Sequence, residues 1–194
     1  IVSSSSEGQQ GNNSSYSPSI SFDGGTVAFE SLASNLVASD SNGTWDVFVR
    51  EIANQTTDLV SSSSARIQGN SNSRSPSISA DGRVIGFSSE ATNLVPGDTN
   101  GLTDVFIKDL VTLMTTRSSV SSSGTQAAGN PPADSRSPSL STTGGIVVFQ
   151  SGAENLVADD WNRMFDAFGR DRESGVTSRV SQDRVPVLGA WDSL

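Results

Sequence analysis

The 194-residue sequence contains neither cysteine nor histidine. Without cysteine the chain forms no disulfide and has no thiolate nucleophile, and the usual zinc sites are excluded. The absence of histidine removes the commonest general base, and with it the Ser-His-Asp triad. Any chemistry must therefore come from carboxylates, hydroxyls, amides and a few basic side chains.

Basic residues and long apolar runs are also scarce. The chain has 12 basic and 21 acidic residues, a net charge of -9, and no basic stripe, so no nucleic-acid partner is expected. No run of about 18 apolar residues exists, so we expect no membrane span. An acidic surface favours solubility and cation binding. A start at Ile1 predicts a processed or partial chain, with any signal peptide already removed.

Internal repetition is what the sequence has in abundance. The segment "SPSISFDGGTVAFE" begins at Ser17, and similar segments begin 58 residues later at Ser75 and a further 62 residues later at Ser137. The segment "SNLVASDSNGTWDVFVRE" recurs with the same spacings. A valine followed by serine is the third marker of the repeat, and we place it at Val2, Val60, Val120 and Val180.

These markers predict one repeat domain over residues 1–194. We expect repeat units at residues 17–74, 75–136 and 137–194, with residues 1–16 as the tail of a preceding unit. Each unit predicts four short strands, because turn residues separate runs with a period of two, and no stretch has a sustained period of 3.6. Phenylalanines that recur in phase should be core residues: Phe29, Phe48, Phe87, Phe106, Phe149 and Phe168.

A four-stranded unit of about sixty residues, stacked on copies of itself, is typical of a β-propeller blade. The predicted fold is therefore an all-β propeller with three blade repeats in this chain. The segment "SPSISADGRVIGFSSEATNLVPGDTNGLTDVFIKD", residues 75–109, resembles the repeat of TolB-like (WD-like) bacterial β-propellers. The resemblance covers essentially the whole chain, although "TTGG" and Arg163 depart from it in the third unit. It implies a secreted or periplasmic location in the bacterial envelope and a ring of six or more blades.

Three blades cannot close such a ring, and an open end leaves strand edges that invite pairing with another chain. We therefore expect self-association, with two copies completing a six-bladed ring as a dimer, or a larger assembly. Two alternatives stay open. The chain could be half of a longer polypeptide, or a subunit that polymerises head to tail.

The loop "DSNGTWD" and its two counterparts are the candidate metal sites. Oxygen ligands at relative positions one, three, five and seven, the fifth a backbone carbonyl, suit calcium. Gly43 and Gly101 would permit the tight turn. The alternative is ordinary turn chemistry, in which the same polar side chains bond nearby backbone groups. The candidate calcium ligands are Asp40, Asn42, Thr44, Asp46, Asp98, Asn100, Leu102, Asp104, Asp160, Asn162, Met164 and Asp166.

Three functions are compatible with these features. The first is a non-catalytic secreted or envelope propeller, calcium-stabilised, that acts as a binding or scaffold module for a protein or glycan ligand. The second is a structural subunit of an extracellular assembly or filament. The third is a carboxylate-based carbohydrate-active enzyme, which needs two carboxylates at a fixed separation in one pocket. Most acidic residues recur once per unit, which favours a structural role, and no catalytic residue is assigned.

Overall fold

The computed structural model describes residues 1–129, 133–160 and 162–181. The last part of the third expected repeat, residues 182–194, lies outside the described residues. The described residues form twelve strands. Their bounds are β1 Ser15–Ile20, β2 Thr26–Ser31, β3 Asp46–Glu51, β4 Thr56–Leu59, β5 Ser73–Ile78, β6 Val84–Ser89, β7 Asp104–Asp109, β8 Thr115–Arg117, β9 Ser135–Leu140, β10 Ile146–Ser151, β11 Asp166–Asp171 and β12 Thr177–Arg179.

The strands form three four-stranded antiparallel sheets, each made of consecutive strands. We call them blade 1 (β1–β4), blade 2 (β5–β8) and blade 3 (β9–β12). This confirms the predicted all-β propeller architecture. Within the described ranges, no helix is long and apolar enough to cross a membrane.

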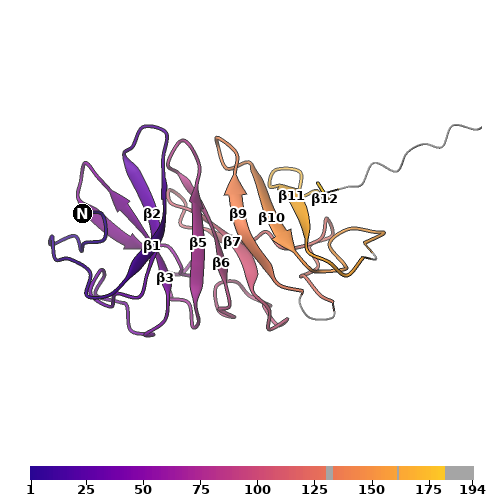
Figure 1. Ribbon diagram of the computed structural model, residues 1–194, viewed down its shortest axis with the longest axis horizontal. Coiled ribbons are helices and arrows are strands. Elements are labelled where there is room, and N and C mark those ends of the chain that lie inside the picture. Colours follow the sequence, from indigo (N-terminus) through magenta and orange to yellow (C-terminus); the bar gives the residue numbers. More distant parts are fainter. Residues whose placement is uncertain (130–132, 161, 182–194) are drawn as a thin grey trace, which may run out of the picture.

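The blades stand side by side in chain order, with the first strands β1, β5 and β9 next to one another (Figure 1). Strand β5 packs against β2 and β3 of blade 1, and β9 packs in the same way against β6 and β7 of blade 2. One apolar cluster joins blades 1 and 2, and a second joins blades 2 and 3. The main core therefore lies between blades, because a single sheet cannot bury both faces alone.

The recurring phenylalanines are core residues, as predicted. Each blade has one on its second strand and one directly opposite on its third. The two rings of each pair stack with centroids 5.9 to 6.0 Å apart. The six side chains are at most 3% exposed.

A basic residue on the third strand ties each blade to the segment that precedes the blade. Arg50 donates to the backbone oxygen of Ser5 at 3.0 Å, and Lys108 donates to that of Ser63 at 3.1 Å. Arg170 repeats the contact in blade 3 with Ser121, at 3.2 Å. The first residues of the chain thus contact blade 1 as the connection after β4 contacts blade 2.

The valine-serine marker was wrong in the middle repeat. The N–H of Val60 bonds the third strand of its blade at Val47, and Val180 makes the same contact in blade 3. In blade 2 this place belongs to Ser118 and not to Val120, two residues further on. A run of serines hides the offset, because "SSVSSS" offers several positions for the same alignment.

Candidate functional site

The three acidic loops lie at the start of the third strand of each blade. The second aspartate of each loop is the first residue of β3, β7 or β11 and is buried. The first aspartate lies six residues earlier, so the loop turns back and brings its two carboxylates to the same place. These pairs are Asp40 with Asp46, Asp98 with Asp104, and Asp160 with Asp166.

The asparagine of each loop is bonded at both ends within the loop. Asn42 Oδ1 accepts the N–H of Thr44 at 2.8 Å, and Asn42 Nδ2 donates to Asp46 Oδ2 at 2.9 Å. Asn100 and Asn162 make the same two contacts with their neighbours. The predicted turn chemistry is therefore present in all three loops. At the fifth position of each loop, it is the backbone N–H that contacts the asparagine, and not the backbone carbonyl. These N–H groups belong to Thr44, Leu102 and Met164.

A serine after the fourth strand holds the buried aspartate from the other side. Its hydroxyl donates to Oδ1 of the aspartate, and the backbone N–H that follows this aspartate donates back to the serine oxygen. The aspartate thus joins the third strand of the blade to the end of its fourth. The three serines are Ser61, Ser119 and Ser181.

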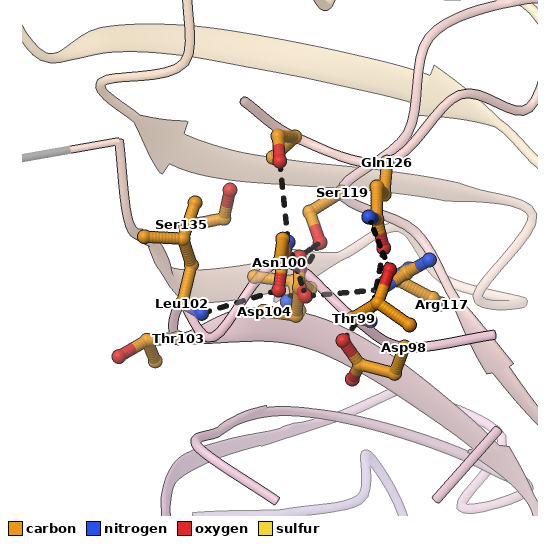
Figure 2. A network of polar contacts seen from close by, with 12 residues as sticks. Asp98, Thr99, Asn100, Leu102, Thr103, Asp104, Arg117, Ser119, Gln126 and Ser135 are labelled. Atoms are coloured by element: carbon orange, nitrogen blue, oxygen red, sulfur yellow. Dashed lines mark hydrogen bonds and ion pairs between the residues drawn. The ribbon is translucent and has the colours of Figure 1, made fainter. Parts of the chain in front are cut away.

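In blades 2 and 3 an arginine guanidinium lies between the two carboxylates. Arg117 Nη1 is 2.9 Å from Asp98 Oδ1 and 3.2 Å from Asp104 Oδ2. Figure 2 shows Arg117 with the two aspartates. Arg179 Nη1 is 2.9 Å from Asp160 Oδ1 and 3.8 Å from Asp166 Oδ2. These two loops therefore contain their own cation.

Blade 1 has no such arginine. The corresponding residue is Leu59, which pairs across the sheet with Phe48 as Arg117 pairs with Phe106. The place between the carboxylates is taken by the uncharged amide of Gln68.

The Gln68 amide bonds both aspartates of the first loop. Its Nε2 donates to Asp40 Oδ1 at 2.9 Å and to Asp46 Oδ2 at 2.8 Å, while its Oε1 accepts the N–H of Ser41 at 3.1 Å. The first loop therefore has two carboxylates and no counter-charge from any residue that the structure describes. Thr44 Oγ1 is also buried there, with no hydrogen-bond partner among the described residues.

The carboxylates of the first loop have raised pKa values. Burial raises the pKa of Asp46 to about 6, against hydrogen bonds from Ser61, Gln68 and Asn42, and the charge of Asp40 adds to the rise. Burial also raises the pKa of Asp40.

In the other two loops the arginine opposes the same effect. The pKa of Asp98 is raised by burial and by the charge of Asp104, and Arg117 counteracts the rise. The pKa of Asp160 is raised in the same way, against Arg179. The three loops thus share one architecture and differ in the group between the carboxylates, which is an uncharged amide in blade 1 and a guanidinium in blades 2 and 3.

The sequence pattern found the carboxylates and asparagines of the site but missed their partners. Gln68, Arg117 and Arg179 lie on later segments of the chain, and the change from Leu59 to arginine in the later repeats was the available signal. Within the described parts of the chain, no group of three or more acidic side chains gathers around one point. Each loop therefore brings together two carboxylates.

An aromatic pair borders the first loop. The rings of Tyr16 and Trp45 stack with centroids 5.6 Å apart, and the guanidinium of Arg74 lies 4.4 Å from the Trp45 ring centroid. The indole therefore packs on its own neighbours, while Tyr16 remains exposed. The two other tryptophans, Trp161 and Trp191, lie outside the described residues.

No protein-family model matches the chain, and no curated protein matches it. Among solved structures it is similar to TolB from Acinetobacter baumannii, with 17% identity, a TM-score of 0.54, and coverage of 88% of this chain and 33% of that one. It is also similar to the β-propeller domain of the Trilobed protease from Pyrococcus furiosus, with 16% identity, a TM-score of 0.55, and coverage of 89% and 44%. The chain spans less than half the length of either. The likeness shows a β-propeller fold like that of TolB.

Proposed function

We propose that this chain is a non-catalytic β-propeller module that acts as a scaffold or binding unit, in a secreted or envelope location. One observation carries the proposal. The loop aspartates that recur in every repeat are all engaged in hydrogen bonds or ion pairs, which join the loop to the rest of its blade. A carboxylate engaged in this way holds the blade together and is poorly placed to act on a substrate.

We further propose that the first loop takes a calcium ion, between Asp40 and Asp46. The equivalent place in blades 2 and 3 holds a guanidinium, so the architecture suits a positive charge there. The Gln68 amide would turn its Oε1 toward the ion, at the loss of the hydrogen bond from Ser41. The Thr44 hydroxyl offers a further oxygen. Calcium accepts such oxygen ligands, and a site with two carboxylates fits the weak, millimolar class found outside cells.

The test exchanges the neutralising group between blades. Leu59→Arg would place a guanidinium in the first loop, and Arg117→Leu would remove one from the second. We expect calcium to raise the melting temperature of the natural chain and a chelator to reverse the rise. Leu59→Arg should abolish the response and should itself stabilise the chain by about 1.5–3 kcal/mol, as a hydrogen bond to a charged group does.

Arg117→Leu is the matched control. It leaves two buried carboxylates without a counter-charge and should destabilise the chain by about 3 kcal/mol at neutral pH. The loss should shrink toward pH 4, because Asp98 and Asp104 can then be protonated. A calcium response that Leu59→Arg leaves intact, or no response in the natural chain, would refute the calcium site. Calcium-independent hydrolysis of polysaccharide substrates would instead favour the carbohydrate-active enzyme.

A further inference from the structure

The outer face of blade 3 is equivalent to the face of blades 1 and 2 on which the next blade packs. In blades 1 and 2 the central residue of this face is Ala28 or Gly86, and both are buried by the following blade. The equivalent residue of blade 3 is Val148, which is 37% exposed. Its neighbours on the same face, Ile146 and Val180, are 40% and 59% exposed.

The opposite end of the molecule carries the other side of this interface between blades. Among the described residues no blade lies before β1, and Ile20 is 61% exposed, whereas the equivalent Ile78 of blade 2 is 7% exposed. Pro18 is exposed, whereas Pro76 and Pro138 are buried. Phe22, in the turn after β1, is 92% exposed.

A polar contact also recurs at these interfaces, and its equivalents at the two end faces have no partner among the described residues. The N–H of Ser75 donates to Glu30 Oε2 at 2.6 Å across the first interface, and the N–H of Ser137 donates to Ser88 Oγ at 3.1 Å across the second. The next acceptor in the series is Gln150, exposed on β10, and the first donor is the N–H of Ser17 on β1. Ser17 already has the positive φ of 50° that Ser75 shares at 53°.

The shape of the blade 3 face is that of an interface. Each blade pairs residues of complementary size at its centre: Ala28 with Val49, Gly86 with Ile107, and Val148 with Gly169. Where the second strand carries a large side chain, the third carries a glycine, so the paired volume stays nearly constant. Interiors require such matching because they are close-packed.

We propose that two copies bind each other head to tail. The blade 3 face of one copy, formed by Ile146, Val148, Gln150 and Val180, would bind the β1 face of the other, formed by Ser17, Pro18, Ile20 and Phe22. Gln150 would accept the N–H of Ser17 from the other copy, and Pro18 and Ile20 would cover Val148. A second copy is the occupant because the chain carries both halves of an interface that it also forms twice internally. Two copies make the contact twice if a two-fold axis closes the ring, and the second contact then forms at high effective concentration. The inference goes beyond the proposed function and needs no calcium.

The absence of cysteine allows a direct test. Two single-cysteine variants, Ser17→Cys and Gln150→Cys, are purified separately, mixed, and treated with a short bifunctional thiol reagent. We expect a covalent dimer in the mixture and much less in either variant alone, because only the mixture places the two thiols at one interface. The pair Ser88→Cys with Ser137→Cys in one chain is the positive control and should link within the molecule.

The second measurement is sedimentation velocity across the micromolar range, in chelator. We expect the natural chain to sediment as a dimer, or as larger species if the contact does not close, and either result supports the contact. Val148→Glu should return the chain to a monomer, whereas Val111→Glu, in the exposed turn after β7, should not. A natural chain that stays monomeric, or thiol linking as strong within one variant as in the mixture, would overturn the proposal and assign this face to another occupant.

Discussion

At the residue scale, Lys108 is the single lysine of the chain and stands where blades 1 and 3 carry arginine. Its Nζ donates to the backbone oxygens of Ser62 and Ser63 and to the hydroxyl of Thr115. Burial lowers the pKa of Lys108 from its ordinary 10.5 to about 8, and the charge of Arg66 contributes. The amine can therefore lose its proton at a pH where arginine keeps its charge.

This difference predicts a pH dependence that one substitution removes. Between pH 8 and 10.5 the unfolded chain holds the Lys108 proton and the folded chain does not, so stability rises with pH through this window. In Lys108→Arg the rise should be lost, because the guanidinium is charged in both states. Urea unfolding of both proteins at several pH values measures the difference.

Arg50→Lys is the control for this prediction, since it puts an amine at the same place in blade 1. It should add a second rise of the same sign. A natural chain and a Lys108→Arg variant with parallel stability curves above pH 8 would show that another group titrates there.

At the element scale, the turn between the first two strands of each blade carries a glycine, and in blades 2 and 3 this glycine packs on the preceding blade. Gly24, Gly82 and Gly144 have φ values of 72°, 72° and 68°, which glycine adopts without strain. A Cβ on Gly144 would lie 2.7 Å from the side chain of Val84 in blade 2, whereas one on Gly24 would meet nothing nearer than 4.0 Å. The turns are therefore alike in conformation and differ in what they touch.

The pair Gly144→Ala and Gly24→Ala separates the two effects. Both should lose about 1 kcal/mol from the positive φ. Gly144→Ala should lose about 1–3 kcal/mol more, because the added methyl group overpacks the contact with blade 2. Denaturant unfolding at low protein concentration gives both values. Equal losses would mean that blade 3 shifts freely away from Val84.

The strands and the stacked phenylalanines were predictable because each depends on a local pattern repeated three times. The neutralising groups of the acidic loops were not, because they come from segments far along the chain. Asp98 meets Arg117 19 residues later, and Asp40 meets Gln68 28 residues later. A loop pattern such as Asp-x-Asn-Gly describes its own turn. It cannot reveal whether an uncharged amide or a guanidinium from a later segment will lie between the two carboxylates.

At the scale of the whole molecule, the two end faces favour association between copies and the net charge opposes it. The faces proposed to meet are built from uncharged residues, among them Ile20, Val148 and Gln150. Each copy nevertheless carries a net charge of -9, so two copies repel each other over their whole surfaces. Association should therefore depend on salt although no ion pair lies at the proposed contact.

This reasoning predicts that added salt strengthens self-association. The Debye length falls from about 30 Å at 0.01 M ionic strength to about 8 Å at 0.15 M, which screens the repulsion and leaves apolar burial unopposed. The dimer Kd should tighten by about 2- to 10-fold over that range. Sedimentation equilibrium in sodium chloride and chelator measures it, with Val148→Glu as the control that should stay monomeric at both salt levels. An association that weakens with salt would instead indicate ion pairs between the copies, and the uncharged faces would not be the ones in contact.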